Sequence, residues 1–155
     1  MPGASTEAMV ILFLTNCMKL LILINFVAGI MSNDPILLIK FSGFEPAKGK
    51  VYMNVYNSKA AFLKPDQAVH KFSFEPKQSD HPLIKVSLPN SPTIAIACFQ
   101  DINGNQKLDT NTFGIPTEPY AFSNNARGKW KKPTWDDAAI KWKSGVPLEL
   151  KLHYW

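Results

Sequence analysis

Short stretches in which apolar residues alternate with polar ones, each closed by Pro or Gly, constrain the fold of this chain most strongly. Residues 50–57 and 148–154 show the pattern most cleanly, with apolar side chains at every second position. A period of two is typical of strands with one buried face, whereas an amphipathic helix has a period near 3.6. Twelve Pro and eight Gly in 155 residues also disfavour long helices. The pattern therefore predicts an all-β fold.

Most of the chain after residue 35 can be assigned to strands of this kind. Residues 45–49 contain Pro and Gly, and they are predicted to join the first two strands in a hairpin. Thr134 is expected to cap one helical turn over residues 135–139. The expected strands are residues 36–44, 50–57, 70–74, 84–88, 93–100, 140–143 and 148–154.

The spacing of these strands favours an immunoglobulin-like β-sandwich of about seven strands. One long ordered loop interrupts the spacing, from residue 101 to about residue 138. A loop of about 38 residues without secondary structure is uncommon in a compact domain and is usually functional where it occurs. Cys98, in the apolar run before this loop, is expected to be a small buried hydrophobic side chain. The sandwich is thus predicted to carry its function in the loop.

Residues 1–32 differ in character and are predicted to be a signal or targeting segment. Met18 and Lys19 precede a short apolar stretch and then small residues, so Met18 is also a candidate for the true start. Residues 33–155 are then a single β-sandwich domain, exported to the periplasm or secreted. The alternative is an uncleaved membrane anchor over residues 9–31, which are numerous enough to cross a bilayer. Lys19 near the middle of that stretch argues against an anchor.

The start of the long loop carries oxygen-bearing side chains at alternate positions, in the order D-x-N-G-N-x-x-x-D. Calcium takes six to eight oxygen ligands, so a loop that binds it must wrap around the ion with every second residue turned inward. We therefore expect a calcium-stabilised loop with a weak dissociation constant, about 10⁻⁴ to 10⁻³ M, as in extracellular modules. The expected ligands are Asp101, Asn103, Asn105, the backbone carbonyl of Lys107, Asp109 and Glu118.

This series departs from an EF-hand loop at two positions. Gln106 stands where Gly is usual, and Thr112 stands where a bidentate acid is usual. Asp and Asn side chains also hydrogen-bond to their own backbone in tight turns. The alternative is therefore a loop that closes on itself without a metal ion.

The second half of the loop is dense in hydrogen-bonding groups and is predicted to contact a ligand. Arg127 can hold a carboxylate or a phosphate through two parallel hydrogen bonds. The nearby aromatic rings favour a sugar-binding face, although such rings more often anchor a loop by packing. The expected ligand-binding residues are Tyr120, Ser123, Asn124, Asn125, Arg127 and Trp130.

The net charge of the chain indicates which class of partner to expect. The formal net charge is +5, and lysines become frequent towards the end of the chain. A positive surface attracts polyanions, so an anionic or carbohydrate component of the cell envelope is an expected partner. A solvated surface with a modest positive excess is the simpler alternative. No nucleic-acid-binding motif surrounds these lysines, so no specific nucleic acid is expected.

Three runs follow one another from residue 101 onward: D-x-N-G-N-x-K-x-D-T-N, F-G-I-P-x-E-P-Y-x-F-S-N-N-A-R-G and P-T-W-D-D-A. Together they resemble the bacterial family known as domain of unknown function 2141. The likeness extends from about Leu37 to the C-terminus and includes the segment GKVYMNVYN. It implies a small exported all-β protein with no assigned activity, and family members often have Gly in place of Gln106. The signature residues are Asp101, Asn103, Asn105, Asp109, Gly114, Pro116, Glu118, Pro119, Tyr120, Ser123, Asn124, Asn125, Arg127 and Gly128.

The sequence as a whole predicts an exported, non-catalytic binding or structural module with a calcium-stabilised loop. No nucleophile elbow, phosphate-binding loop, dinucleotide fingerprint or zinc-binding helix is found. Two alternatives stay open. One is a carboxylate-dependent glycan hydrolase that works through Glu118 or Asp109, and the other is a metal-free interaction domain.

Overall fold

The structure is a computed structural model, and it describes residues 34–77, 82–88, 91–128 and 131–155. The chain divides into Met1–Asn33 and a compact unit, Asp34–Trp155, which is described here. The predicted targeting segment and Trp130 lie outside the described residues. Within the described part of the chain, no helix combines the length and the apolarity that a membrane crossing needs.

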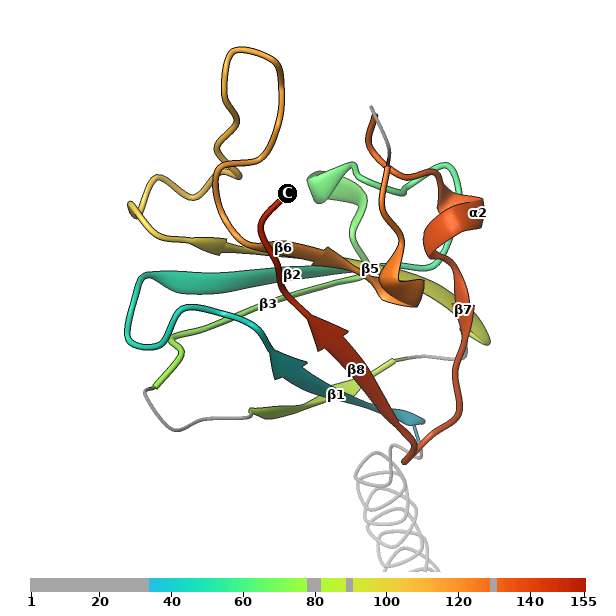
Figure 1. The fold of residues 1–155 in the computed structure, drawn as a ribbon. Helices are drawn as coiled ribbons and strands as arrows, with labels where there is room; N and C mark the ends of the chain where they lie inside the picture. Colours follow the sequence, from blue (N-terminus) through green and yellow to red (C-terminus); the bar gives the residue numbers. More distant parts are fainter. Residues whose placement is uncertain (1–33, 78–81, 89–90, 129–130) are drawn as a thin grey trace, which may run out of the picture. The chain divides into compact units, whose positions relative to one another are not determined.

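The described residues form two sheets, and the first has three strands in the order β4-β1-β8 (Figure 1). Its central strand runs antiparallel to β4 and parallel to β8. Because β8 comes from the end of the chain, this parallel pairing joins the two ends of the compact unit. The bounds are β1 Ile36–Ser42, β4 Leu83–Ser87 and β8 Pro147–Lys151.

The second sheet is antiparallel, with the order β3-β2-β5-β6 and a short strand, β7, that also pairs with β5. The nine-residue β5 is its centre and the longest strand among the described residues. The bounds are β2 Lys50–Tyr56, β3 His70–Phe74, β5 Thr93–Asp101, β6 Tyr120–Phe122 and β7 Ile140–Lys141. Three short helical turns complete the elements of the described residues: η1 Pro65–Gln67, η2 Ser123–Asn125 and α2 Trp135–Ala138.

Both sheets contribute side chains to one hydrophobic core. Leu37, Ile39 and Phe41 of β1 are fully buried, as is Val51 of β2, because alternate residues of a strand point to the same face. Burying a large apolar side chain contributes about 1.5–3 kcal/mol. The all-β fold predicted from the sequence is confirmed, whereas its immunoglobulin-like form stays a prediction.

The hairpin predicted over residues 36–57 is wrong, because β1 and β2 belong to different sheets. The segment between them crosses from one sheet to the other, and the buried side chain of Gln100 holds it in place. The Gln100 amide donates to the carbonyl oxygens of Glu45, at 2.7 Å, and Lys48, at 2.6 Å. Its oxygen accepts from the Glu45 backbone N–H at 2.7 Å. Alternation in the sequence identifies the buried face of a strand but not its partner.

The long loop expected over residues 101–138 is shorter in the structure, because β6 lies within it and pairs with the edge of β5. Three residues are too few for a recognisable alternation, so this strand has no signal of its own in the sequence. The predicted helical turn is confirmed as α2. The Thr134 hydroxyl accepts from the Asp137 backbone N–H, and the Asp137 carboxylate accepts from the Thr134 backbone N–H.

Cys98 should be unreactive in the folded protein. Its side chain is buried, and burial raises the pKa of the thiol to about 12. Compared with a thiol of the ordinary pKa, 9.0, the fraction of Cys98 present as the reactive thiolate is lower by about a thousandfold. In a Cys17→Ser background, we expect the disulfide reagent DTNB to label Cys98 only after unfolding in guanidinium. Equal labelling rates with and without guanidinium would contradict this burial.

Candidate functional site

The loop of residues 101–119 begins with a tight turn built around the carboxylate of Asp101. This side chain is buried at the end of β5. One carboxylate oxygen accepts from the backbone N–H groups of Gly104, at 2.8 Å, and Asn105, at 3.1 Å. The other accepts from Gln106 at 2.8 Å. Gln106 has a left-handed backbone, with φ of 63°, which is a conformation that Gly adopts more readily.

Glu118 closes the base of the loop from its other end. Glu118 is 5% exposed. It accepts from the Ile102 backbone N–H at 2.8 Å and from the Asp109 backbone N–H at 3.0 Å. One buried side chain therefore ties together the start, the middle and the end of the loop.

Asp109 occupies the centre of the loop and faces two side-chain amides. Its two carboxylate oxygens accept from Asn103 at 2.6 Å and from Asn105 at 2.9 Å. With Asp101 and Glu118, all six carboxylate oxygens of the loop accept an N–H. No three His, Cys, Asp or Glu side chains among the described residues are grouped so that they could hold a metal ion. The predicted side-chain ligands are thus drawn into one hydrogen-bond network, and calcium binding stays a prediction.

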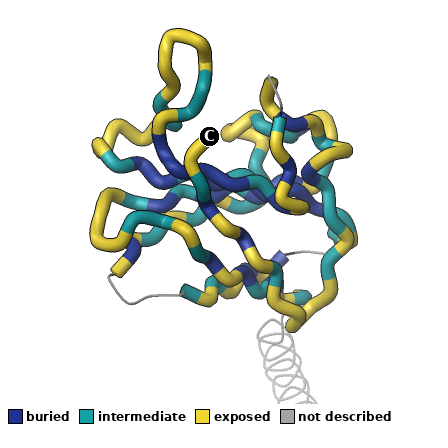
Figure 2. The backbone as a smooth tube through the Cα atoms, viewed as in Figure 1, coloured by how far each residue is buried: buried dark blue, intermediate teal, exposed yellow. Residues whose placement is uncertain are grey.

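The tip of the loop is a second, smaller turn. The side-chain oxygen of Asn111 accepts from the backbone N–H groups of Phe113, at 2.9 Å, and Ile115, at 3.0 Å. Phe113 is 86% exposed, so its ring is not used to anchor the tip. In Figure 1 the loop rises from the end of β5 and returns to β6, and Figure 2 shows its outer part exposed.

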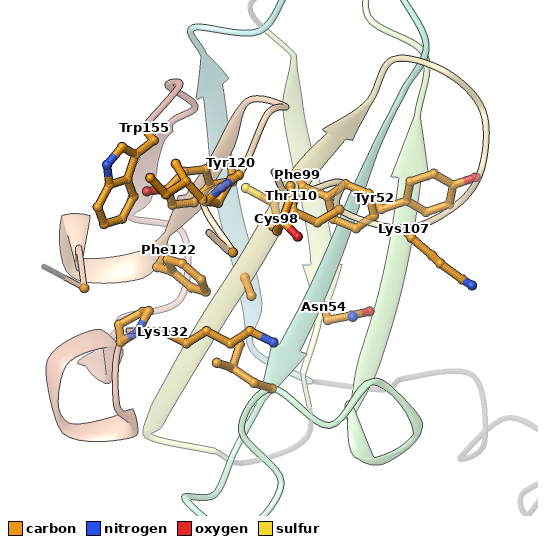
Figure 3. A pocket seen from close by; sticks show the side chains of 18 of the residues that line it. Tyr52, Asn54, Cys98, Phe99, Lys107, Thr110, Tyr120, Phe122, Lys132 and Trp155 are labelled. Atoms are coloured by element: carbon orange, nitrogen blue, oxygen red, sulfur yellow. The ribbon is translucent and has the colours of Figure 1, made fainter. Parts of the chain in front are cut away.

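A cleft of about 730 Å³ lies beside this loop, on the face of the second sheet that points away from the core. Its floor contains a row of three aromatic residues on adjacent strands, Tyr52, Phe99 and Tyr120, which are paired in the sheet register. The rings of Tyr52 and Phe99 are stacked, with centroids 5.5 Å apart and planes at 21°. We call this space the aromatic cleft (Figure 3).

The walls of the aromatic cleft come from four separate segments. They are the loop of residues 101–119, residues 63–65, Gly128 with residues 131–133, and the C-terminal Trp155. Lys107, Lys131 and Lys132 line it, and no Asp, Glu or His is among its described lining residues. Figure 3 shows Lys107 and Lys132 coming from different sides of the sheet face. The cleft is therefore apolar at its base and positively charged around its sides.

The residues predicted to bind a ligand are placed in different environments. Tyr120 lies in the aromatic cleft, and burial raises the pKa of its hydroxyl. Ser123 is buried and accepts from the Ile96 backbone N–H at 2.8 Å while donating to the Ala138 carbonyl at 2.6 Å, so it joins η2 to β5 and α2. The Asn124 amide donates to the Asp137 carbonyl at 2.8 Å. These contacts give Ser123 and Asn124 structural roles.

Asn125 and Arg127 are exposed, and Arg127 is not among the residues that line the cleft. The charge of Arg127 nevertheless reaches the cleft, because it counteracts the burial that raises the pKa of Tyr120. The structure therefore brings Tyr120 and the side chain of Lys107 into one cleft and leaves Asn125 and Arg127 outside it.

Most residues of the cleft floor are not among those predicted from the sequence to bind a ligand. Tyr52 and Asn54 stand on the outer face of β2, and the alternation had separated that face from the core. The signal that points to these residues is a strand face with aromatic and polar side chains, opposite a face that is apolar. Phe99 gave no such signal, because it lies in an almost wholly apolar run.

Comparison with known proteins places the chain in a family. The family model described as an uncharacterised protein conserved in bacteria, DUF2141, matches residues 39–147, which include the loop and the strands of the cleft floor. The chain belongs to the DUF2141 family. The resemblance inferred from the signature runs is thus confirmed, and the DUF2141 description assigns no activity. No curated protein and no solved structure matches the chain.

Proposed function

We propose that this DUF2141 member is an exported, non-catalytic binding module whose loop of residues 101–119 is stabilised by calcium. The loop supports a binding role because it is extensively ordered by its own hydrogen bonds and stands beside an open cleft. A wall that is ordered before the ligand arrives loses less conformational entropy on binding.

The environment of the carboxylates supports a non-catalytic role over a glycan hydrolase. Glycoside hydrolysis needs two carboxyl groups on either side of the scissile bond. Asp109 and Glu118 instead accept hydrogen bonds within the loop, and no Asp or Glu lines the described part of the cleft.

The observation that carries the calcium proposal is the uncompensated negative charge of the loop. Asp101 and Glu118 are buried, and Asp109 is partly buried. The ion pairs formed among the described residues involve other acids, namely Glu45, Glu75, Asp136 and Glu149. Buried charges in proteins are usually paired with an opposite charge or bound to a metal ion. A cation would supply the missing positive charge.

The side-chain amides around Asp109 offer a way to admit such a cation. An Asn amide has an oxygen and a nitrogen of nearly the same shape, so a half-turn exchanges donor for acceptor. After that turn, Asn103 and Asn105 would direct oxygen atoms towards the space in front of Asp109. They would give up the hydrogen bonds that these oxygens now accept from the backbone N–H groups of Asn105, at 3.1 Å, and Lys107, at 2.9 Å. Oxygen ligands of this kind suit calcium.

Thermal unfolding of the whole protein tests the proposal. We expect the Tm to rise by several degrees between EDTA and about 10 mM calcium, because a ligand with a dissociation constant near 1 mM stabilises the folded state by about 1.4 kcal/mol under these conditions. Magnesium at the same concentration is the control, because it requires a smaller and more rigid site. An unchanged Tm in calcium would contradict the calcium proposal.

The second candidate is a metal-free interaction domain, which is favoured because all six carboxylate oxygens of the loop already accept hydrogen bonds. The variant Asn105→Asp distinguishes this candidate from a calcium-stabilised module. The variant places a carboxylate against Asp109, so it should lower the Tm in EDTA through like-charge repulsion. With calcium, the added charge should enlarge the calcium-dependent rise in Tm. A metal-free loop would instead be destabilised equally in both conditions.

A further inference from the structure

We infer that the aromatic cleft binds a small anionic amphiphile, meaning an apolar body that carries one carboxylate or phosphate group. This inference rests on the proposed binding role but not on calcium. It assigns the ligand to the outer face of the second sheet, whereas the predicted calcium ligands belong to the loop.

The size and composition of the cleft fit such a molecule. A volume of about 730 Å³ lies within the range of sites for small molecules, about 300–1,000 Å³. Apolar side chains form both the floor and the walls, including Leu63, Leu108, Ile115 and Phe122. A face that is apolar on several sides suits a hydrocarbon or ring body better than a sugar, whose hydroxyl groups would lose their hydrogen bonds to water.

A small residue lies in the floor between two larger ones. Ala97 lies on β5 between Asn54 of β2 and Phe122 of β6, which are its partners in the sheet register. Because Ala has only a methyl group, it fills less of the space above the sheet than the side chains on either side of it. An apolar body would therefore have most room at this position.

The charges at the sides of the cleft select the sign of the ligand. Lys107 and Lys132 form none of the ion pairs found among the described residues, which involve Lys40, Lys48, Lys50 and Lys59. Lys131, in contrast, interacts with an acid outside the cleft, Asp137. Hydrogen bonds from Thr134 lower the pKa of the Asp137 carboxylate, and the charge of Lys131 lowers it further. Two lysines without an ion pair, and no Asp or Glu side chain among the described lining residues, favour an anionic head group. Lysines commonly lay their apolar stems along such a surface while the ammonium group stays in water.

Calorimetric titration of the whole protein with matched twelve-carbon amphiphiles tests the inference. Dodecanoate and dodecyl phosphate represent the two sources of the anionic group, and dodecylammonium is the cationic control. Both anions, or one of them, should bind below the concentration at which they form micelles, and added salt should weaken the binding. Their relative affinities identify the preferred head group.

Variants then separate the charge from the apolar floor. The double variant Lys107→Met and Lys132→Met keeps apolar stems but removes both charges, and it should weaken anion binding by about tenfold. Lys85→Met, on the exposed side of β4 in the other sheet, is the matched control and should leave binding unchanged. Ala97→Leu should abolish binding by filling the floor.

A measurement on the unaltered protein guards against a variant that fails to fold. In two-dimensional NMR spectra, dodecanoate or dodecyl phosphate should shift the resonances of Tyr52, Phe99 and Tyr120 and leave those of β1 and β4 unchanged. Absence of binding by both anions would overturn the inference without affecting the calcium-dependent Tm. Equal affinity for dodecylammonium, or an unchanged affinity in the double lysine variant, would also overturn it.

Discussion

Glu118→Ala is expected to lower the free energy of unfolding by about 2–4 kcal/mol, because the variant leaves two backbone N–H groups without their acceptor. These groups belong to Ile102 and Asp109, at opposite sides of the loop. Glu118 is only 5% exposed, so water cannot easily replace its carboxylate as the acceptor for the two N–H groups. Urea denaturation measures the loss, and hydrogen exchange should show the amides of both residues exchanging faster.

Two matched variants show whether this loss comes from the hydrogen bonds. Glu118→Gln keeps the shape but replaces one acceptor oxygen with a donor, so about half of the loss should remain. Glu149→Ala removes an exposed glutamate, whose side chain is 76% exposed, and should change the stability by less than about 0.5 kcal/mol. If Glu118→Gln were as stable as the natural protein, the proposed role of the carboxylate in closing the loop would be wrong.

Gly49→Ala should be the more damaging change, with an expected loss above about 3 kcal/mol. Gly49 has a left-handed backbone, with φ of 54°, and a Cβ atom added there would lie 1.8 Å from the carbonyl oxygen of Asp101. That oxygen belongs to the backbone where β5 ends and the loop begins, so it cannot move without disturbing both. Urea denaturation and the yield of folded protein measure the effect.

Gly145→Ala separates backbone strain from the clash. Gly145 also has a positive φ, 77°, but nothing lies within 4 Å of the Cβ that Ala would add. Its expected cost is therefore only that of the left-handed conformation, about 1–2 kcal/mol. Equal losses in the two variants would show that the close approach of Gly49 to Asp101 does not matter for stability.

Much of the fold could be predicted because strands leave a local pattern. The alternation in residues 50–57 identified Val51, Met53 and Val55 as the buried face of β2, and the structure buries all three. The capping box of Thr134 and Asp137 is also a local feature, since both residues lie within one turn.

The candidate site could be predicted only in part. The acids and amides of the loop were identified as an interacting set, because their spacing lies within a few residues. Bonding of such side chains to their own backbone was kept as an alternative. The particular N–H groups that Asp101 and Glu118 bind could not be predicted, because they depend on how the loop folds back on itself. The aromatic cleft was missed because Tyr52, Phe99 and Tyr120 become neighbours only when β2, β5 and β6 pair.

By itself, the sequence determined the all-β class, the buried face of most strands and the family to which the chain belongs. Only the tertiary structure decided that β1 and β2 lie in different sheets, that β6 completes the edge of β5, and that lysines from separate segments surround one aromatic floor. The physical reason is the distance along the chain between the residues that interact. Side-chain alternation follows from the geometry of a single strand, whereas strand pairing depends on contacts between residues far apart in the chain.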